Sequence, residues 1–222
     1  MSNVLSRQIA NWVQERLAQT GRCGIAFPGG RSPIALMHSL RVEPLDWTRV
    51  DVTLVDERAV DSSAEASNAR LVQSEFLVDR ASHATFHPLH IGQTAQGSAQ
   101  ALNAGSHPLP DIAVLGFGED GHFASIFPGE MVGFESEEAF FATPPLGQPC
   151  VQRISMTWRA INDAKYRVLL ASTEAKADLL HRVCRESIRF SCPLSVLAQA
   201  ERPTWVQWPN GELERLEPVT SG

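Results

Sequence analysis

The chain has 222 residues, of which 43% are hydrophobic and 20% are charged, and its net charge is −6 at pH 7. This composition is typical of a globular protein, and we expect residues 1–222 to form a single domain. The acidic balance, without a basic tract, argues against nucleic acid and anionic membranes as partners. No apolar run reaches transmembrane length, and the first residues lack the apolar core of a signal peptide. We therefore expect a cytoplasmic monomer or small homo-oligomer.

In chain order, apolar periodicity and breaker residues predict a helix at 5–17, a strand at 24–30, a helix at 32–40, a strand at 51–58, a helix at 67–77, a strand at 84–91, a helix at 94–104, strands at 111–118, 150–155 and 166–172, a helix at 174–186 and a last strand at 203–208. Gly21 ends the first of these helices. Pro33 is expected at the first position of the second helix, and Ser67 or Asn68 caps the third.

Alternation of helices with strands, several of them continuously apolar, predicts an α/β protein whose mostly parallel sheet is covered on both faces. In such sheets ligands bind beyond the carboxyl ends of the strands. Three segments at such ends carry glycine or charge: PGGRSP (28–33), DER (56–58) and GFGEDGH (116–122). Their convergence predicts a site at that edge of the sheet.

The cysteines and histidines show no pattern of metal ligands. None of the four cysteines stands in a CxxC pair, so reduced structural thiols are expected at Cys23, Cys150, Cys184 and Cys192. His83, His87 and His90 would share one face of a helix, but Pro88 lies among them and the segment is typical of a strand. We expect no bound metal.

The segment PGGRSP has the chemistry of a phosphate site. Gly29 and Gly30 permit a tight turn with outward N–H groups, and the following helix N-terminus adds partial positive charge. Arg31 adds a full charge and Ser32 a hydroxyl. The segment is not a P-loop, because no GK[ST] follows. Taken alone, it fits an ordinary strand-to-helix turn equally well.

The segment GFGEDGH contains the histidine that we select as a candidate base. Its glycines permit close approach of a ligand, and Asp120, two residues before His122, can orient the imidazole or accept a substrate hydroxyl. Because an imidazole ordinarily titrates near neutral pH, it can take a proton from water. The alternative is that His122 caps a following helix.

Three further cations are candidates for holding an anionic substrate. Arg58 ends the DER segment, while Arg153 in QRIS and Lys176 in STEAKA lie near the ends of other predicted strands. A guanidinium matches the geometry of phosphate, although a charge at such a position can equally be solvated surface. No GxSxG elbow occurs and no cysteine has a supporting context, so the chemistry would use an activated water.

Together these segments resemble the 6-phosphogluconolactonase family. The resemblance runs in order through PGGRSP, DERAV with SN nine residues past Arg58, LGFGEDGHFASIFPG, RIS, and a lysine in a helix after a strand. It extends from about Gly24 to Lys176. The third motif is the most specific, since the family's pattern there is LGxGxDGHxASLFPG.

The resemblance implies a three-layer α/β/α fold with a modified Rossmann-like, mostly parallel sheet. It also implies a cofactor-free hydrolase of the pentose phosphate pathway, whose small-molecule substrate is the sugar-phosphate lactone 6-phospho-D-glucono-1,5-lactone and whose product is 6-phospho-D-gluconate. By the same resemblance Asp120 and His122 are catalytic. The residues that match the family's substrate- and phosphate-binding positions are Gly29, Gly30, Arg31, Ser32, Arg58, Arg153 and Lys176.

Glucosamine-6-phosphate deaminases share this fold and look similar through DGH, but they continue with GHxAFNEPG, whose glutamate helps to open the sugar ring. Phe127 occupies that position here, which disfavours deamination or aldose–ketose isomerisation. An isomerase or deaminase, or a non-catalytic sugar-phosphate-binding protein, are the alternatives. Two departures from the family stand out: Thr173 replaces a glycine before Lys176 and leaves the position of that lysine open, and the segment Glu130 to Pro149 has no counterpart.

Overall fold

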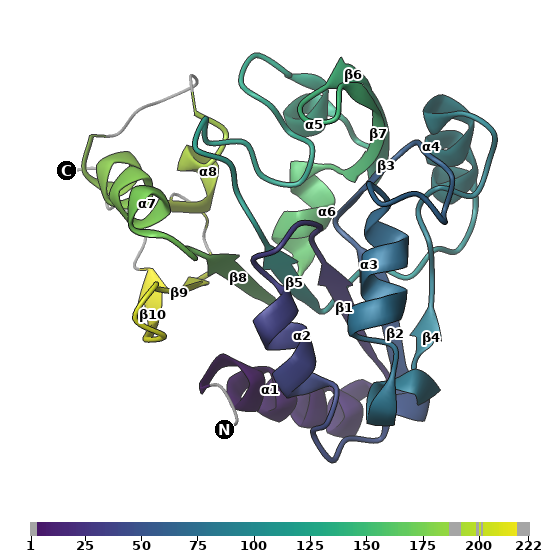
Figure 1. The fold of residues 1–222 in the computed structure, drawn as a ribbon, viewed down its shortest axis with the longest axis vertical. Coiled ribbons are helices and arrows are strands. Elements are labelled where there is room, and N and C mark those ends of the chain that lie inside the picture. The colour runs from purple at the N-terminus through teal and green to yellow at the C-terminus, as the bar shows by residue number, and fades with distance from the viewer. Residues whose placement is uncertain (1–3, 187–191, 199, 201, 217–222) are drawn as a thin grey trace.

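The computed structural model describes residues 4–186, 192–198, 200 and 202–216. Its central sheet has seven strands, in the spatial order β10 (Leu213–Leu216), β9 (Thr204–Gln207), β8 (Tyr166–Leu170), β5 (Ile112–Leu115), β1 (Cys23–Phe27), β2 (Val50–Leu54) and β4 (Thr85–Phe86) (Figure 1). Neighbouring strands are parallel except β9 and β10, which are antiparallel. The mostly parallel sheet is therefore confirmed.

A second, antiparallel sheet consists of β3 (Asp56–Arg58), β7 (Val151–Met156) and β6 (Phe140–Leu146). The single strand predicted at 51–58 is wrong, because the chain changes sheets at Val55. The Val55 N–H donates to the Phe27 carbonyl at 3.0 Å, and its own carbonyl accepts from the Met156 N–H at 2.9 Å. The DER segment is thus a strand of the second sheet and not a loop at a strand end.

Helices cover both faces of the central sheet. The α-helices are α1 (Val4–Thr20), α2 (Ile34–Leu40), α3 (Asn68–Glu75), α4 (Ala95–Ala104), α5 (Val132–Glu135), α6 (Trp158–Asp163), α7 (Glu174–Glu186) and α8 (Ser195–Ala198), with short 3₁₀ helices at Trp47–Arg49 and Asp79–His83. Helix α2 contacts α1 and α3 on one face, while α4 and α6 pack with the second sheet on the other. Right-handed crossovers explain this division. The chain passes from β1 through β2 to β4 in one direction across the sheet and then returns through β5 and β8 in the other, so the helices before and after β4 lie on opposite faces. The three-layer α/β/α fold is confirmed.

Local signals set several of the element boundaries. Gly21, at φ 82°, follows α1 as expected. Ser67 is the cap of α3, since its side chain accepts from the Arg70 N–H at 3.2 Å. Pro33 precedes α2 and is not its first residue. The strand predicted at 203–208 is not the last, because β10 follows it. Both ends of the predicted domain, 1–222, lie outside the described residues, so the extent of the domain stays a prediction.

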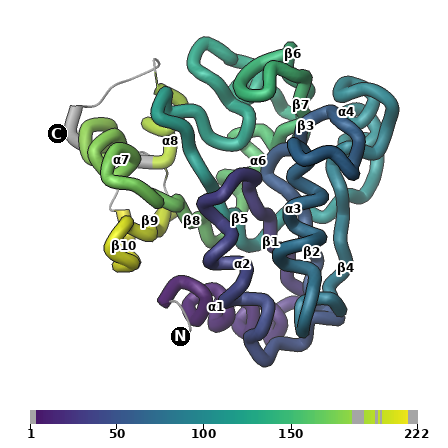
Figure 2. Tube along the Cα trace, viewed as in Figure 1, coloured from purple at the N-terminus to yellow at the C-terminus, as the bar shows by residue number. Residues whose placement is uncertain are grey.

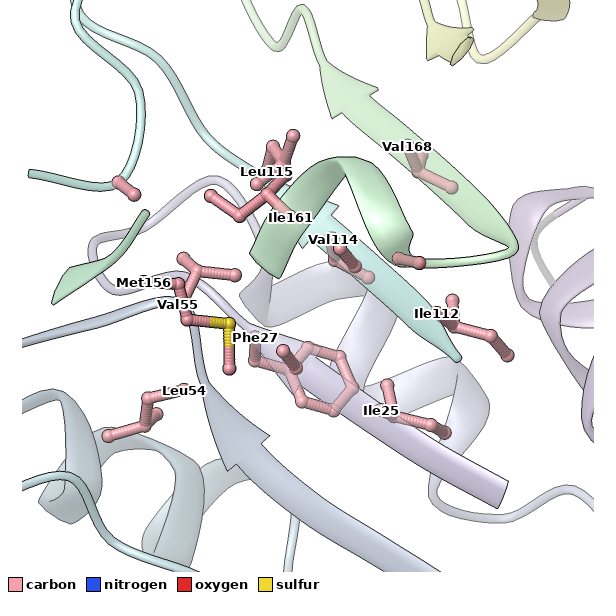
Figure 3. Packing of buried hydrophobic residues seen from close by; sticks show 14 of the residues in the cluster. Ile25, Phe27, Leu54, Val55, Ile112, Val114, Leu115, Met156, Ile161 and Val168 are labelled. Carbon is pink, nitrogen blue, oxygen red and sulfur yellow. The ribbon is translucent and has the colours of Figure 1, made fainter. Parts of the chain in front are cut away.

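The core lies between the strands and the helix layers (Figure 3). Every residue of β1 and β5 is buried, which explains the continuous apolar runs of these strands. Figure 3 shows Phe27 of β1, Met156 of β7 and Ile161 of α6 in one packed cluster, so the second sheet and α6 share the core of the central sheet. None of the helices in the described part of the chain combines the length and apolarity needed to cross a membrane.

Candidate active site

The loops that follow β1, β5 and β8 meet at a pocket of about 700 Å³. The chain leaves β1 toward β2 and β4 on one side and returns to β5 on the other, so the pocket lies at the topological switch point of the sheet. All the predicted site residues line it except Asp120, which contacts His122. The lining residues are Pro28, Gly29, Gly30, Arg31, Ser32, Asp56, Arg58, Asn68, Gly116, Phe117, Gly118, Glu119, His122, Ala124, Arg153, Ser172, Thr173 and Lys176.

His122 and Asp120 form a hydrogen-bonded pair. Nδ1 of His122 lies 2.6 Å from Oδ1 of Asp120, and the same oxygen accepts the His122 backbone N–H at 3.2 Å. In the described part of the chain Nε2 has no protein partner, so it is the nitrogen that can accept a proton. The next helix, α5, begins only at Val132, so the alternative that His122 caps a helix is wrong.

Glycine is required where the loop passes under the pair. A Cβ on Gly118 would come within 2.3 Å of Cε1 of His122 and 2.5 Å of Oδ1 of Asp120. Gly121 has a φ of 82°, and its carbonyl accepts the Leu194 N–H at 3.0 Å. Figure 2 shows the loop after β5 passing beside α8, the helix that follows Leu194. The bend is therefore held from a segment distant in sequence.

A hydroxyl and ammonium cluster lies on the β1 and β8 side of the pocket. Ser32 Oγ lies 2.9 Å from Ser172 Oγ, and the Lys176 ammonium donates to Ser32 at 3.4 Å. Thr173 accepts the Lys176 backbone N–H, which fixes the first turn of α7 at the pocket. Desolvation by burial lowers the pKa of Lys176. The position of Lys176, which the sequence left open, is thus beside the glycine turn, where Gly30 has a φ of 77°.

Two arginines face each other across the second sheet, where Arg58 of β3 is paired with Arg153 of β7. The guanidinium of Arg153 donates to the Leu146 carbonyl at 3.2 Å and to the Gln148 carbonyl at 3.3 Å, and lies 3.6 Å from the Asp56 carboxylate. Burial lowers the pKa of Arg153. Most donors of Arg153 are therefore engaged by the protein, and the segment 130–149 provides carbonyls that hold this arginine.

Arg58 has fewer of its donors engaged by the protein than Arg153. Its Nη1 donates to the Ala66 carbonyl and to Oδ1 of Asn68, both at 2.8 Å. Its Nε is buried and has no hydrogen-bond partner among the described residues. A Cβ on Gly29 would come within 1.8 Å of Oδ1 of Asn68, so this glycine permits the close approach of Asn68 to the PGGRSP turn.

Sequence reasoning missed Asp56, Asn68 and Ser172 as pocket residues. Asp56 is buried and accepts the Ser125 hydroxyl at 2.6 Å. The strand predicted at 51–58 included DER, and because side chains alternate along a strand, that pattern puts Asp56 and Arg58 on one face and Glu57 on the other. Glu57 indeed accepts the N–H groups at the start of α3, and burial raises its pKa.

No metal centre is found in the described residues: they contain no group of three His, Cys, Asp or Glu side chains that could hold an ion. His87 and His90 have protein partners, the Asp51 carboxylate at 2.9 Å and the Val60 carbonyl at 3.0 Å. His83 ends the 3₁₀ helix Asp79–His83, and β4, within the strand predicted at 84–91, comprises only Thr85–Phe86. The four cysteines are free thiols.

Comparison with known proteins gives one consistent result. A family model described as glucosamine-6-phosphate isomerases/6-phosphogluconolactonase matches residues 1–206. A 6-phosphogluconolactonase of Rhizobium meliloti is 34% identical, over 93% of this chain and 94% of its own, and one of Helicobacter pylori is 32% identical, over 90% and 89%. The crystal structure of a 6-phosphogluconolactonase from Shewanella baltica superimposes with a TM-score of 0.84 at 32% identity, covering 92% of this chain and 91% of that one. With the ordered pocket motifs, these matches show that the chain belongs to the glucosamine-6-phosphate isomerase/6-phosphogluconolactonase family.

Proposed function

We propose that this protein hydrolyses 6-phospho-D-glucono-1,5-lactone to 6-phospho-D-gluconate, the lactone step of the oxidative pentose phosphate pathway. The observation that carries the proposal is the His122–Asp120 pair, 2.6 Å apart, in a pocket otherwise rich in cations. The names of the curated relatives, which this chain matches over most of its length, support the same substrate. The free thiols and the metabolic role support a cytoplasmic location.

The substrate phosphate would bind between the glycine turn and the start of α7. There the N–H groups of Gly29 and Gly30, the Ser32 hydroxyl and the Lys176 ammonium surround one part of the pocket. An ammonium, hydroxyls and outward N–H groups are suitable donors for a phosphate dianion. Arg31 also lines this part and adds positive charge. The phosphate end would then fix the ring with its C1 carbonyl near His122.

His122 would act as a general base. Nε2 takes a proton from a water molecule as the water oxygen attacks C1, and Asp120 holds Nδ1–H and stabilises the imidazolium that forms. The oxyanion would receive hydrogen bonds from the Gly116–Gly118 bend or from Arg58. The tetrahedral intermediate then collapses with cleavage of the C1–ring oxygen bond. The imidazolium returns its proton to the leaving oxygen, and the product ionises to a carboxylate.

Phe127 separates this proposal from the isomerase and deaminase alternative. Its ring, and not a carboxylate, stacks on the His122 imidazole, with centroids 4.4 Å apart. No acid at that position can therefore assist ring opening. Hydrolysis needs only a base, a water and orientation, all of which the pocket supports.

The test follows acid release from freshly prepared phosphogluconolactone, above its spontaneous hydrolysis, with wild-type protein and the His122→Ala variant. We expect acceleration by the wild type and a loss of about 10²- to 10⁴-fold in kcat for the variant. Product affinity should be retained. Ammonia release from glucosamine 6-phosphate is the control for deamination. Binding of phosphogluconate without acceleration would favour a non-catalytic binding protein.

A further inference from the structure

One buried aromatic ring contacts both the candidate base and a cation of the second sheet. The ring of Phe127 stacks on the imidazole of His122, with centroids 4.4 Å apart and planes 27° from parallel. The guanidinium carbon of Arg153 lies 5.5 Å from the centroid of the same ring. Phe127 is only 8% exposed. These contacts link His122, on the loop after β5, to β7.

A reversal of the chain brings Phe127 back to His122. Ala124 has a φ of 48°, a conformation that costs energy for a residue with a side chain, and the Ile126 N–H donates to the Phe123 carbonyl at 3.0 Å. The reversal therefore has to be held by its surroundings. The fixed return of the chain places an aromatic side chain five residues after the histidine against the imidazole.

The second sheet holds this reversal in place. The Ser125 hydroxyl donates to the Asp56 carboxylate at 2.6 Å, and the Ser125 N–H donates to the Ser155 hydroxyl at 3.1 Å. A Cβ on Gly147, in the turn between β6 and β7, would come within 2.9 Å of Cζ of Phe127. The ring is therefore confined by backbone at its far edge, and it cannot move away from His122 without disturbing that turn.

The pair with Asp120 alone does not fix the imidazole. A single hydrogen bond at Nδ1 sets the distance to the carboxylate but permits the ring plane to turn about that contact. The side chains of His122 and Asp120 are 29% and 51% exposed, so solvent does not confine them. A stacked ring removes the remaining freedom, which is the pre-organisation that proton transfer needs.

We propose that Phe127 is a positioning residue that holds the His122 imidazole with Nε2 in the orientation for proton transfer. The proposal rests on the proposed function for its kinetic consequence, but the placement of the imidazole can be tested without it. Phe127 is not among the residues that line the pocket and has no group that can exchange a proton, so it acts through His122.

The kinetic test compares Phe127→Leu with Phe123→Leu, a matched change in the same loop. Phe123 is fully buried and packs edge-on against Trp158 at 6.0 Å, and no ring contact joins it to the imidazole. We expect Phe127→Leu to lower kcat by about 10- to 100-fold with KM changed less than about twofold, and Phe123→Leu to lower stability more than kcat. In a His122→Ala background Phe127→Leu should lower kcat no further. An equal loss in both backgrounds would overturn the proposal.

The second readout is the NMR signal of the His122 imidazole protons, assigned by their loss in His122→Ala. A stacked phenyl ring shifts them upfield, so Phe127→Leu should move them downfield and Phe123→Leu should not. An unchanged signal in Phe127→Leu would overturn the proposal even if the lactone is hydrolysed. The expected change would support the placement even if the proposed function failed. If Phe127→Leu does not fold, Phe127→Met, whose flexible side chain fills irregular space, replaces it in both tests.

Discussion

Replacing Asp120 by Asn removes one negative charge next to His122 and keeps an oxygen that can accept the Nδ1–H. The two groups are 2.6 Å apart, and their side chains are 29% exposed for His122 and 51% exposed for Asp120. Two unit charges about 4 Å apart interact by about 1 kcal/mol in water and about 4 kcal/mol in a partly buried setting. Because half of the Asp120 side chain is exposed, the value should lie near the lower limit.

A loss of about 1 to 2 kcal/mol of stabilisation of the imidazolium corresponds to about a 10-fold fall in kcat. We therefore expect Asp120→Asn to be about 10-fold slower than wild type in lactone hydrolysis. It should remain clearly faster than His122→Ala, which loses the base itself, about 10²- to 10⁴-fold. Asp120→Ala should lie between these two variants, because it loses both the charge and the contact that orients the ring.

The assay is initial-rate acid release at neutral pH, corrected for spontaneous hydrolysis, with Glu137→Gln as a charge control. Glu137 is 96% exposed and pairs with Arg159, so this control changes the net charge equally without touching the pocket. A rate for Asp120→Asn equal to wild type would refute an electrostatic role of the carboxylate. A rate as low as that of His122→Ala would refute the division of roles within the pair.

Three further outcomes are expected. Burial lowers the pKa of His107 to about 4, below its ordinary value of 6.5, so the unfolded state binds more protons between these values. The free energy of unfolding, measured by urea titration, should fall by about 1 to 3 kcal/mol as pH drops from 6.5 to 4. The variant His107→Gln should show a smaller fall. An equal reduction of the fall in His83→Gln, a change at an exposed histidine, would contradict the assignment to His107. Gly118→Ala should lower kcat about 10-fold or more by displacing the imidazole, and full activity with an intact fold would contradict the clearance argument. Because burial lowers the pKa of Lys176, its ammonium should lose a proton, and the affinity for phosphogluconate should weaken, at a pH below the range in which a lysine ordinarily titrates. In calorimetry at several pH values, Lys176→Arg should remove this dependence. An unchanged pH profile in that variant would exclude Lys176 as the group responsible.

The central sheet could be predicted from the sequence because its signals are local. The strands predicted at 24–30, 111–118 and 166–172 contain the apolar runs 25–27, 112–115 and 168–171, which are typical of strands buried on both faces, and each strand ends in a segment with glycine or hydroxyl groups. Given a parallel sheet, such segments must lie at the same edge. To predict that the PGGRSP turn lies next to GFGEDGH, it was therefore enough to know which strands are neighbours in the sheet.

The second sheet could not be predicted because its pairings are distant in sequence. Asp56–Arg58 pairs with residues 153–155, and nothing around Val55 indicates that the chain changes sheets there. β6 includes Pro144 and Pro145, which argue against a strand in a sequence but are tolerated here because β6 is an edge strand. For the same reason the sequence could not predict which residues surround Arg153, or that they engage most of the donors of its guanidinium.

The structure also explains why GFGEDGHFASIFPG was the most specific of the motifs. Three positions of the motif contact or make room for one imidazole: Gly118 leaves it space, Asp120 bonds its Nδ1, and Phe127 stacks on its plane after the reversal at Ala124. A glycine turn or an isolated arginine has many other uses in proteins, so PGGRSP and DER could only suggest a ligand. A histidine with supporting residues at offsets of −4, −2 and +5 has fewer other uses, because the next helix, α5, begins only at Val132 and His122 therefore caps no helix. The spacing of the residues that support the His122 imidazole, more than the fold, therefore links this sequence to the proposed chemistry.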